Sequence, residues 1–160
     1  MPLWAFSQSY RFTRNGKKLG RLVKPLTLIL FDHGRFQLSA SDGRHFEITV
    51  PRRAAGYTGS REVGMALYEN EKKIASLAPE AEMATTEISR IQWGDRHFHC
   101  VMGAVGSFEI TENGRRIGSL TSHGFLGREK TIELPQEIPF EVQALIFLGT
   151  VQPKRTSIEA

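Results

Sequence analysis

Cysteine is almost absent from this chain of 160 residues, which contains only Cys100. A lone cysteine excludes an internal disulfide, and a protein without disulfides is typical of a reducing compartment. The first ten residues, MPLWAFSQSY, contain no basic segment followed by a long apolar run, so no secretory leader is expected. These features favour a cytoplasmic protein.

Sequence motifs for nucleotide, metal or acyl chemistry are also scarce. The glycine-containing stretch GRRIGSLTSHG from Gly114 has neither the strand-to-helix setting nor the Gly-Lys-Ser/Thr ending of a phosphate-binding loop. His97 and His99 share one face of a predicted strand and could begin a zinc site, but no second pair of His or Cys accompanies them. Cys100 points to the other face, away from His99, which argues against a Cys–His nucleophile. We therefore predict no catalytic residue, no metal and no cofactor, and expect a protein that is not an enzyme.

A hairpin pattern, in contrast, occurs three times, at residues 10–22 (YRFTRNGKKLGRL), 65–77 (MALYENEKKIASL) and 108–120 (FEITENGRRIGSL). In each copy, apolar and polar residues alternate up to an asparagine, which is the period of a strand. Two basic residues, an aliphatic residue, a small residue and finally a leucine follow the turn. The repetition predicts three equivalent pieces of one sheet.

The turn chemistry of these copies predicts their register. Asn-Gly in the first and third copies is a strong signal for a two-residue hairpin turn, because both central residues need positive φ. In that register Phe12 faces Leu19 and Ile110 faces Ile117. The second copy has Asn-Glu, which suits positive φ less well, so its turn is predicted to be longer or distorted.

Two further hairpins are predicted between the repeats. Around Asp42-Gly43, a three-residue loop pairs Leu38 with Phe46, and around Gly94-Asp95 a two-residue turn pairs Ile91 with Phe98. Residues 26–31 and 130–134 read as additional strands, whereas residues 51–62 read as a surface loop and residues 78–87 as a loop or one helical turn. About twelve short strands joined by hairpins indicate an antiparallel meander.

A different pattern begins at Pro139, where an apolar run is bounded by Pro153. Strand alternation fails across residues 144–148, so a helix over about residues 139–151 is predicted, with a strand as the alternative. About 12 residues at 1.5 Å each span roughly 18 Å, too short for a hydrocarbon core of about 30 Å. A buried helix fills a barrel too wide for side chains alone. We therefore predict one domain, residues 1–160 with 152–160 as a tail, that is a closed antiparallel barrel around this helix.

These elements resemble the tubby-like C-terminal fold, whose superfamily includes tubby proteins, phospholipid scramblases and LURP-one-related proteins. The resemblance covers nearly the whole chain and rests on the repeated ENGRRIGSL-type hairpin and on LPQEIPFEVQALIFL at residues 134–148. It implies phosphoinositide or membrane association, and for scramblases calcium-linked lipid scrambling. The chain lacks an Asp-rich loop before the helix, a cysteine cluster for palmitate and a Pro-rich N-terminal arm, so scrambling is not expected.

The recurring basic pairs are the candidate site. They follow each repeated turn and comprise Lys17, Lys18, Lys72, Lys73, Arg115 and Arg116. One interpretation is solubility of the hairpin tips; the other is a patch for phospholipid headgroups, consistent with a net charge of +4. The predicted function is a non-enzymatic binding or scaffold module with an anionic membrane lipid or a protein as partner. A small-molecule enzyme or carrier with a pocket at the barrel mouth is the alternative.

Nucleic acid is a less favoured partner. Trp4, Trp93 and Tyr57 have arginines nearby, as in stacking platforms for single strands. However, Trp93 lies at a hairpin end and Trp4 near a terminus, so the aromatic side chains do not form a predicted row.

Overall fold

The structure is a computed structural model of the chain, and it describes residues 9–23, 34–50, 64–79, 87–103, 107–123 and 129–151. These residues form eleven strands and a helix. The elements are β1 (Ser9–Arg14), β2 (Lys17–Val23), β3 (Gly34–Ala40), β4 (His45–Val50), β5 (Met65–Glu69), β6 (Lys72–Pro79), β7 (Glu87–Trp93), β8 (Arg96–Met102), β9 (Ser107–Glu112), β10 (Arg115–His123), β11 (Glu129–Glu133) and α1 (Phe140–Val151).

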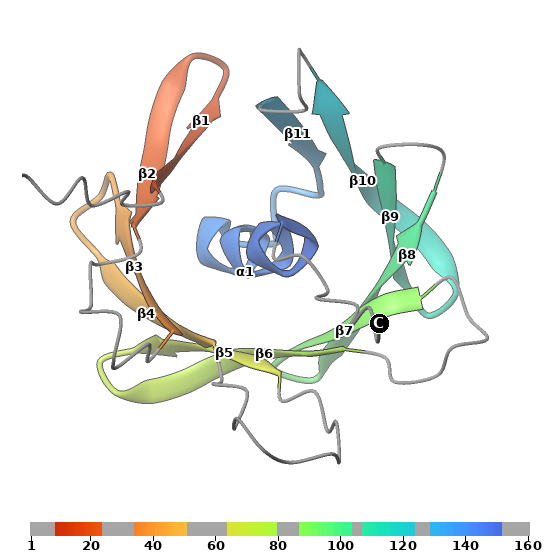
Figure 1. Cartoon of the computed structure of the whole chain (residues 1–160), viewed down its shortest axis with the longest axis horizontal. Helices are drawn as coiled ribbons and strands as arrows, with labels where there is room; N and C mark the ends of the chain where they lie inside the picture. The colour runs from red at the N-terminus through yellow and green to blue at the C-terminus, as the bar shows by residue number, and fades with distance from the viewer. Residues whose placement is uncertain are drawn as a thin grey trace, which may run out of the picture.

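All eleven strands belong to one antiparallel sheet, in which each strand pairs with its neighbours in the chain. Figure 1 shows this sheet curving around α1, with β1 and β11 as its two edge strands. The mainly-β meander is thus confirmed, and so is the strand near residues 130–134. The predicted strand at 26–31 and the predicted loop at 51–62 lie outside the described residues. The predicted loop or helical turn at 78–87 is wrong at its ends, because Ala78 and Pro79 belong to β6 and Glu87 to β7, and residues 80–86 lie outside the described residues. Within the described strands β1 does not pair with β11, so a closed barrel is not established.

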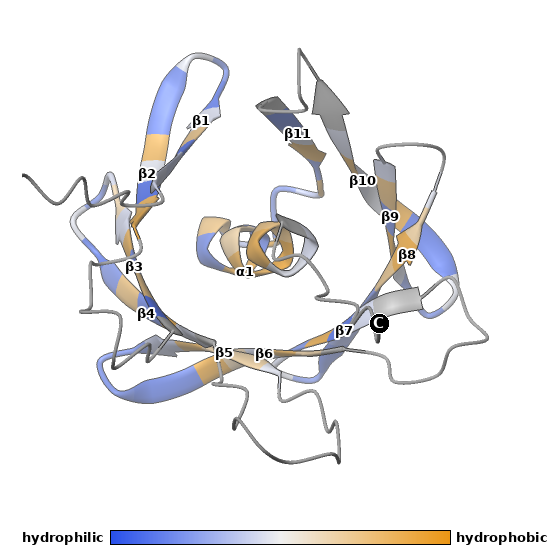
Figure 2. Cartoon of the chain, in the orientation of Figure 1, coloured by the Kyte–Doolittle hydropathy of each residue, from blue (hydrophilic) through white to orange (hydrophobic). Residues whose placement is uncertain are grey.

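The predicted C-terminal helix is confirmed and is buried inside the curve of the sheet. Its first turn is closed by the Pro139 carbonyl, which accepts hydrogen bonds from the amides of Val142 and Gln143 at 3.1 Å. Leu145 and Leu148 are fully buried, and every residue from 141 to 148 is buried. Figure 2 shows the apolar helix surrounded by strands whose hairpin tips are hydrophilic. In the part of the chain that the structure describes, no helix is long and apolar enough to cross a membrane.

Aromatic contacts attach the edge strand β1 to the helix. The Phe12 ring lies 5.3 Å from the rings of both Phe140 and Phe147 in edge-to-face geometry, and Tyr10 lies 5.0 Å from Phe147. Such pairs contribute about 0.5–1.5 kcal/mol beyond their buried area. The interior side chains of β1 therefore pack on α1 even though β1 has a neighbouring strand on one side only among the described residues.

The predicted register of the repeated hairpins is wrong by one residue. Phe12 pairs with Gly20, not Leu19, and Ile110 pairs with Gly118, not Ile117. All three copies contain a β-bulge after their basic pair, at which the aliphatic residue has no partner in the register: Leu19, Ile74 and Ile117. A bulge places two residues opposite one and increases the local twist, which the turn signal alone does not reveal.

The bulge explains the small residue that follows it in each copy. A Cβ atom on Gly20 would collide with the Phe140 ring and the Ser39 carbonyl, and one on Gly118 with the Glu133 carbonyl and Leu134. The small residue therefore lets the neighbouring backbone and the entry to the helix approach the sheet closely. This packing requirement accounts for part of the repeated sequence pattern.

The other two hairpins have the predicted geometry. Leu38 pairs with Phe46 across a loop whose Gly43 has a φ of 91°, and Ile91 pairs with Phe98 across the Gly94 turn. In both hairpins the turn residues and the pairing of apolar residues indicate the same register, and the structure has that register.

The second repeated turn does not have the predicted longer or distorted form. Asn70 and Glu71 form a two-residue turn with φ values of 49° and 66°, and Glu69 pairs directly with Lys72. The pairing of the flanking strands imposes the same turn as in the other copies. Glu71 consequently occupies the left-handed region, which is unfavourable for a residue with a Cβ.

Replacing Glu71 with glycine should therefore stabilise the protein by about 1 kcal/mol, because glycine adopts positive φ without steric cost. Urea unfolding should show a higher midpoint with an unchanged slope. The matched change Gly114→Ala, at a φ of 75°, should lower the midpoint. Equal stability of Glu71→Gly and the parent chain would show that the turn is not strained.

Candidate functional site

Five tight turns lie along one edge of the curved sheet, here named the turn rim. Consecutive strands are antiparallel neighbours, so the turns after β1, β3, β5, β7 and β9 all occur at the same edge. The three repeated tips are the first, third and fifth of these turns. The structure therefore brings the three predicted basic pairs to one rim, which the sequence alone did not decide.

Most of the predicted cations on the turn rim have no carboxylate partner. Arg116 lies 3.5 Å from Glu109, and both side chains are well exposed. The other five form no ion pair with a described residue: Lys17, Lys18, Lys72, Lys73 and Arg115. Exposed and unpaired, these charges are available to an external anion.

The three tips are not equally positive. The β1–β2 tip carries Arg14 beside its two lysines and no carboxylate between β1 and β2. The β5–β6 tip carries Glu69 and Glu71 beside its lysines, which reduces its field. We therefore expect the β1–β2 tip to attract anions most strongly.

Each of the two intervening hairpins contains an arginine that is already paired with carboxylates. At the β3–β4 turn, the Arg44 guanidinium contacts Asp42 at 2.9 Å and the buried Glu141 of α1 at 3.4 Å. Hydrogen bonds from the Arg44 amide and then from its side chain lower the pKa of the Asp42 carboxyl. This hairpin is thus neutralised from within and linked to the start of the helix.

The β7–β8 turn also has a paired arginine, but its exposed Asp95 forms no ion pair with a described residue and keeps the turn acidic. Arg96 donates two hydrogen bonds to Glu112, at 2.7 and 2.9 Å, and lies 3.9 Å from Glu137. The bond from Arg96 lowers the pKa of the Glu112 carboxyl. The guanidinium also lies over the Trp93 ring, 5.6 Å from its centre, so one face of that indole is covered. Trp93 is therefore poorly placed as a stacking platform for nucleic acid.

The repeated tips are separated along the rim by four strands each. At about 4.8 Å per strand, neighbouring tips lie about 19 Å apart along the sheet. This spacing exceeds the distance of about 8 Å over which salt screens charges at physiological ionic strength. The three tips therefore cannot act together on one small anion, but they can each contact a different anion on an extended surface.

His97, His99 and Cys100, the candidate reactive residues of β8, do not form a reactive cluster. His97 is exposed, whereas Cys100 is fully buried in the core. Among the residues that the structure describes, no three His, Cys, Asp or Glu side chains are grouped to hold a metal ion. Burial raises the pKa of the Cys100 thiol to about 11.

Cys100 should consequently react very slowly with thiol reagents at pH 7, because the reactive thiolate becomes abundant only as the pH approaches 11. The measurement is the rate of labelling in the folded state against the rate in denaturant. We expect labelling to be at least about a hundredfold faster in denaturant, where the thiol pKa is near 8.5. Fast labelling of the folded protein would indicate an activated, accessible thiol instead.

Sequence reasoning missed the internal ion pairs on the rim. Arg44 and Glu141 are separated by 97 residues, and no local pattern connects them. The acidic residue at the start of an apolar helix was the available signal, since a buried Glu141 requires a cationic or hydrogen-bonding partner. The partner itself depends on which hairpin lies beside the helix start.

Comparison of the chain with protein-family models, with curated proteins and with solved structures finds no match. Membership of the tubby-like superfamily therefore stays a hypothesis, which rests on the repeated hairpins and on the stretch at residues 134–148.

Proposed function

We propose that this protein is a non-enzymatic binding module that places its turn rim on an anionic phospholipid surface. The observation that carries the proposal is the gathering of three basic tips, with five unpaired cations, on one rim. The β3–β4 hairpin between them is neutralised internally, whereas the β7–β8 turn adds the exposed carboxylate of Asp95, which opposes binding to an anionic surface. We propose a cytoplasmic protein that associates peripherally with a membrane.

The spacing of the tips favours a surface over a single small ligand. Three contact points about 19 Å apart along a curved rim can each meet a separate headgroup of a bilayer. The interior offers little room to the alternative, a small-molecule enzyme or carrier with a pocket at the barrel mouth, because α1 occupies the centre of the curve. We also propose that the sheet closes into a complete barrel and that the protein is a member of the tubby-like superfamily.

The expected affinity is modest. Each lysine or arginine near an acidic leaflet contributes about 1 kcal/mol, so five give at most about 5 kcal/mol. Glu69 and Glu71 reduce this sum at the β5–β6 tip. Binding of this strength is reversible and responds to the acidic lipid content of the membrane.

Co-sedimentation with vesicles tests the proposal. Vesicles with a substantial fraction of phosphatidylserine should retain the protein, whereas pure phosphatidylcholine vesicles should not. Binding should fall steeply between low salt and 0.15 M, where the screening length is about 8 Å. Binding that is independent of salt and of acidic lipid would refute a role for the rim charges.

A further inference from the structure

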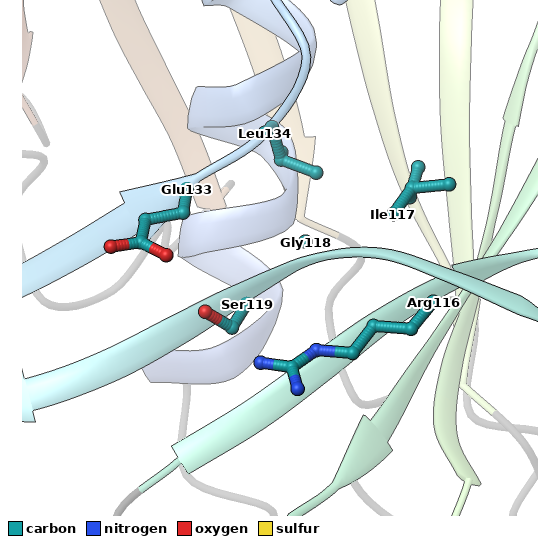
Figure 3. A pocket seen from close by; sticks show the side chains of 6 residues that line it. All are labelled: Arg116, Ile117, Gly118, Ser119, Glu133 and Leu134. Atoms are coloured by element: carbon teal, nitrogen blue, oxygen red, sulfur yellow. The ribbon is translucent and has the colours of Figure 1, made fainter.

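A cavity of about 380 Å³ opens at the turn rim, between the start of β10 and the end of β11. Figure 3 shows its polar lining: the guanidinium of Arg116, the hydroxyl of Ser119 and the carboxylate of Glu133. Leu134 and Ile117 supply apolar walls. The β10 bulge and the missing side chain of Gly118 shape this site, because a Cβ there would meet the Glu133 carbonyl.

Ser119 supplies a hydroxyl to this open cavity. Its side chain belongs to a residue that is only 8% exposed, yet its hydroxyl makes no hydrogen bond with the described residues. Figure 3 places that hydroxyl between the charged ends of Arg116 and Glu133, and Ser119 pairs with Glu133 across the two strands. The hydroxyl oxygen itself stays accessible to solvent, so it can accept a hydrogen bond from a ligand.

The lining carries opposite charges on either side of a hydroxyl. Glu133 is exposed and forms no ion pair with a described residue. Arg116 has one weak contact, to Glu109 at 3.5 Å, which leaves other N–H donors of its guanidinium free. A zwitterion with a primary ammonium close to an anionic group matches this arrangement.

We propose that the cavity binds phosphoethanolamine, with its phosphate on Arg116 and its ammonium on Glu133 and Ser119. The ammonium has three N–H donors, and the carboxylate and the hydroxyl oxygen are acceptors. A choline group has the same charge but no N–H, so it cannot make these bonds. The lipid source, phosphatidylethanolamine in a bilayer, rests on the proposed function, because the cavity lies on the rim that would face the membrane.

The test compares two vesicle types with equal phosphatidylserine, one filled with phosphatidylcholine and one with phosphatidylethanolamine. We expect about tenfold tighter binding to the second, the gain of a net charge-assisted hydrogen bond. Glu133→Gln and Ser119→Ala should each remove most of this preference. Equal binding of the parent chain to both vesicle types would overturn the lipid assignment.

Glu71→Gln is the matched control, since it also removes a carboxylate from the turn rim. It should change binding to both vesicle types by the same factor and keep the preference. A preference that survives Glu133→Gln would come from the packing of the bilayer and not from the cavity, and would also overturn the proposal.

Free phosphoethanolamine separates the cavity from membrane docking. At millimolar concentration it should shift the amide resonances of Gly118 and Ser119, and free phosphocholine should not. These shifts with no vesicle binding would mean that the cavity is real and the membrane function is wrong. Vesicle binding through the tips without any shift or lipid preference would leave the proposed function intact and overturn the cavity proposal.

Discussion

Leu145→Asp should lower the free energy of unfolding by about 4 kcal/mol or more. The side chain is fully buried near the centre of α1 and belongs to the hydrophobic core. The substitution loses about 1.5–3 kcal/mol of apolar burial and adds the cost of an unpaired carboxylate in a dry interior. A loss of about 4 kcal/mol or more is a large part of the 5–15 kcal/mol that stabilises an ordinary domain.

Circular dichroism during urea unfolding measures this effect. Gln136→Asp introduces the same side chain at an exposed position before the helix and should change stability by less than about 0.5 kcal/mol. A Leu145→Asp protein with normal stability would mean that α1 is not enclosed by the sheet.

Reversing both lysines of the β1–β2 tip, Lys17→Glu with Lys18→Glu, should weaken binding to acidic vesicles by about thirtyfold or more. Two favourable terms of about 1 kcal/mol are lost, and each is replaced by repulsion. Extending the reversal to Lys72 and Lys73 should reduce binding below detection at 0.15 M salt. The melting temperature should barely change, because all four lysines are exposed and unpaired.

Arg35→Glu with Arg90→Glu is the control of equal charge. Both residues are exposed and lie away from the turn rim: Arg35 is the second residue of β3, at the opposite edge, and Arg90 is the middle residue of β7. This pair should weaken binding much less, through net charge alone. An equal effect of the two reversals would indicate attraction by the whole molecule and not by the rim.

Turn chemistry and burial allowed most of the fold to be predicted. Asn-Gly and Asp-Gly required positive φ, and the proline-bounded apolar run was too short for a membrane and too apolar for a strand. The predicted register was wrong at Leu19 and Ile117 because each lies in a bulge. A bulge depends on how the twisted sheet packs against the segment that leads into the helix. The prediction of a longer or distorted turn at Glu71 was wrong because strand pairing outweighed the preference of a non-glycine residue for negative φ, which is worth about 1 kcal/mol.

The candidate site was predictable in its residues but not in its arrangement. The basic pairs are visible in the repeats, yet their common rim depends on a complete, uninterrupted meander between β1 and β10. The cavity beside Ser119 had no sequence signal, since Arg116 and Glu133 meet only through the pairing of β10 with β11.

Paramagnetic relaxation by lipids with a spin-labelled headgroup most directly tests whether the turn rim faces the membrane. With acidic nanodiscs, we expect the amides of Gly16, Glu71 and Gly114, one at each tip, to relax faster together. The amide of Met102, at the opposite edge, should be unaffected. Enhanced relaxation at Met102, or at a single tip alone, would contradict docking through the turn rim.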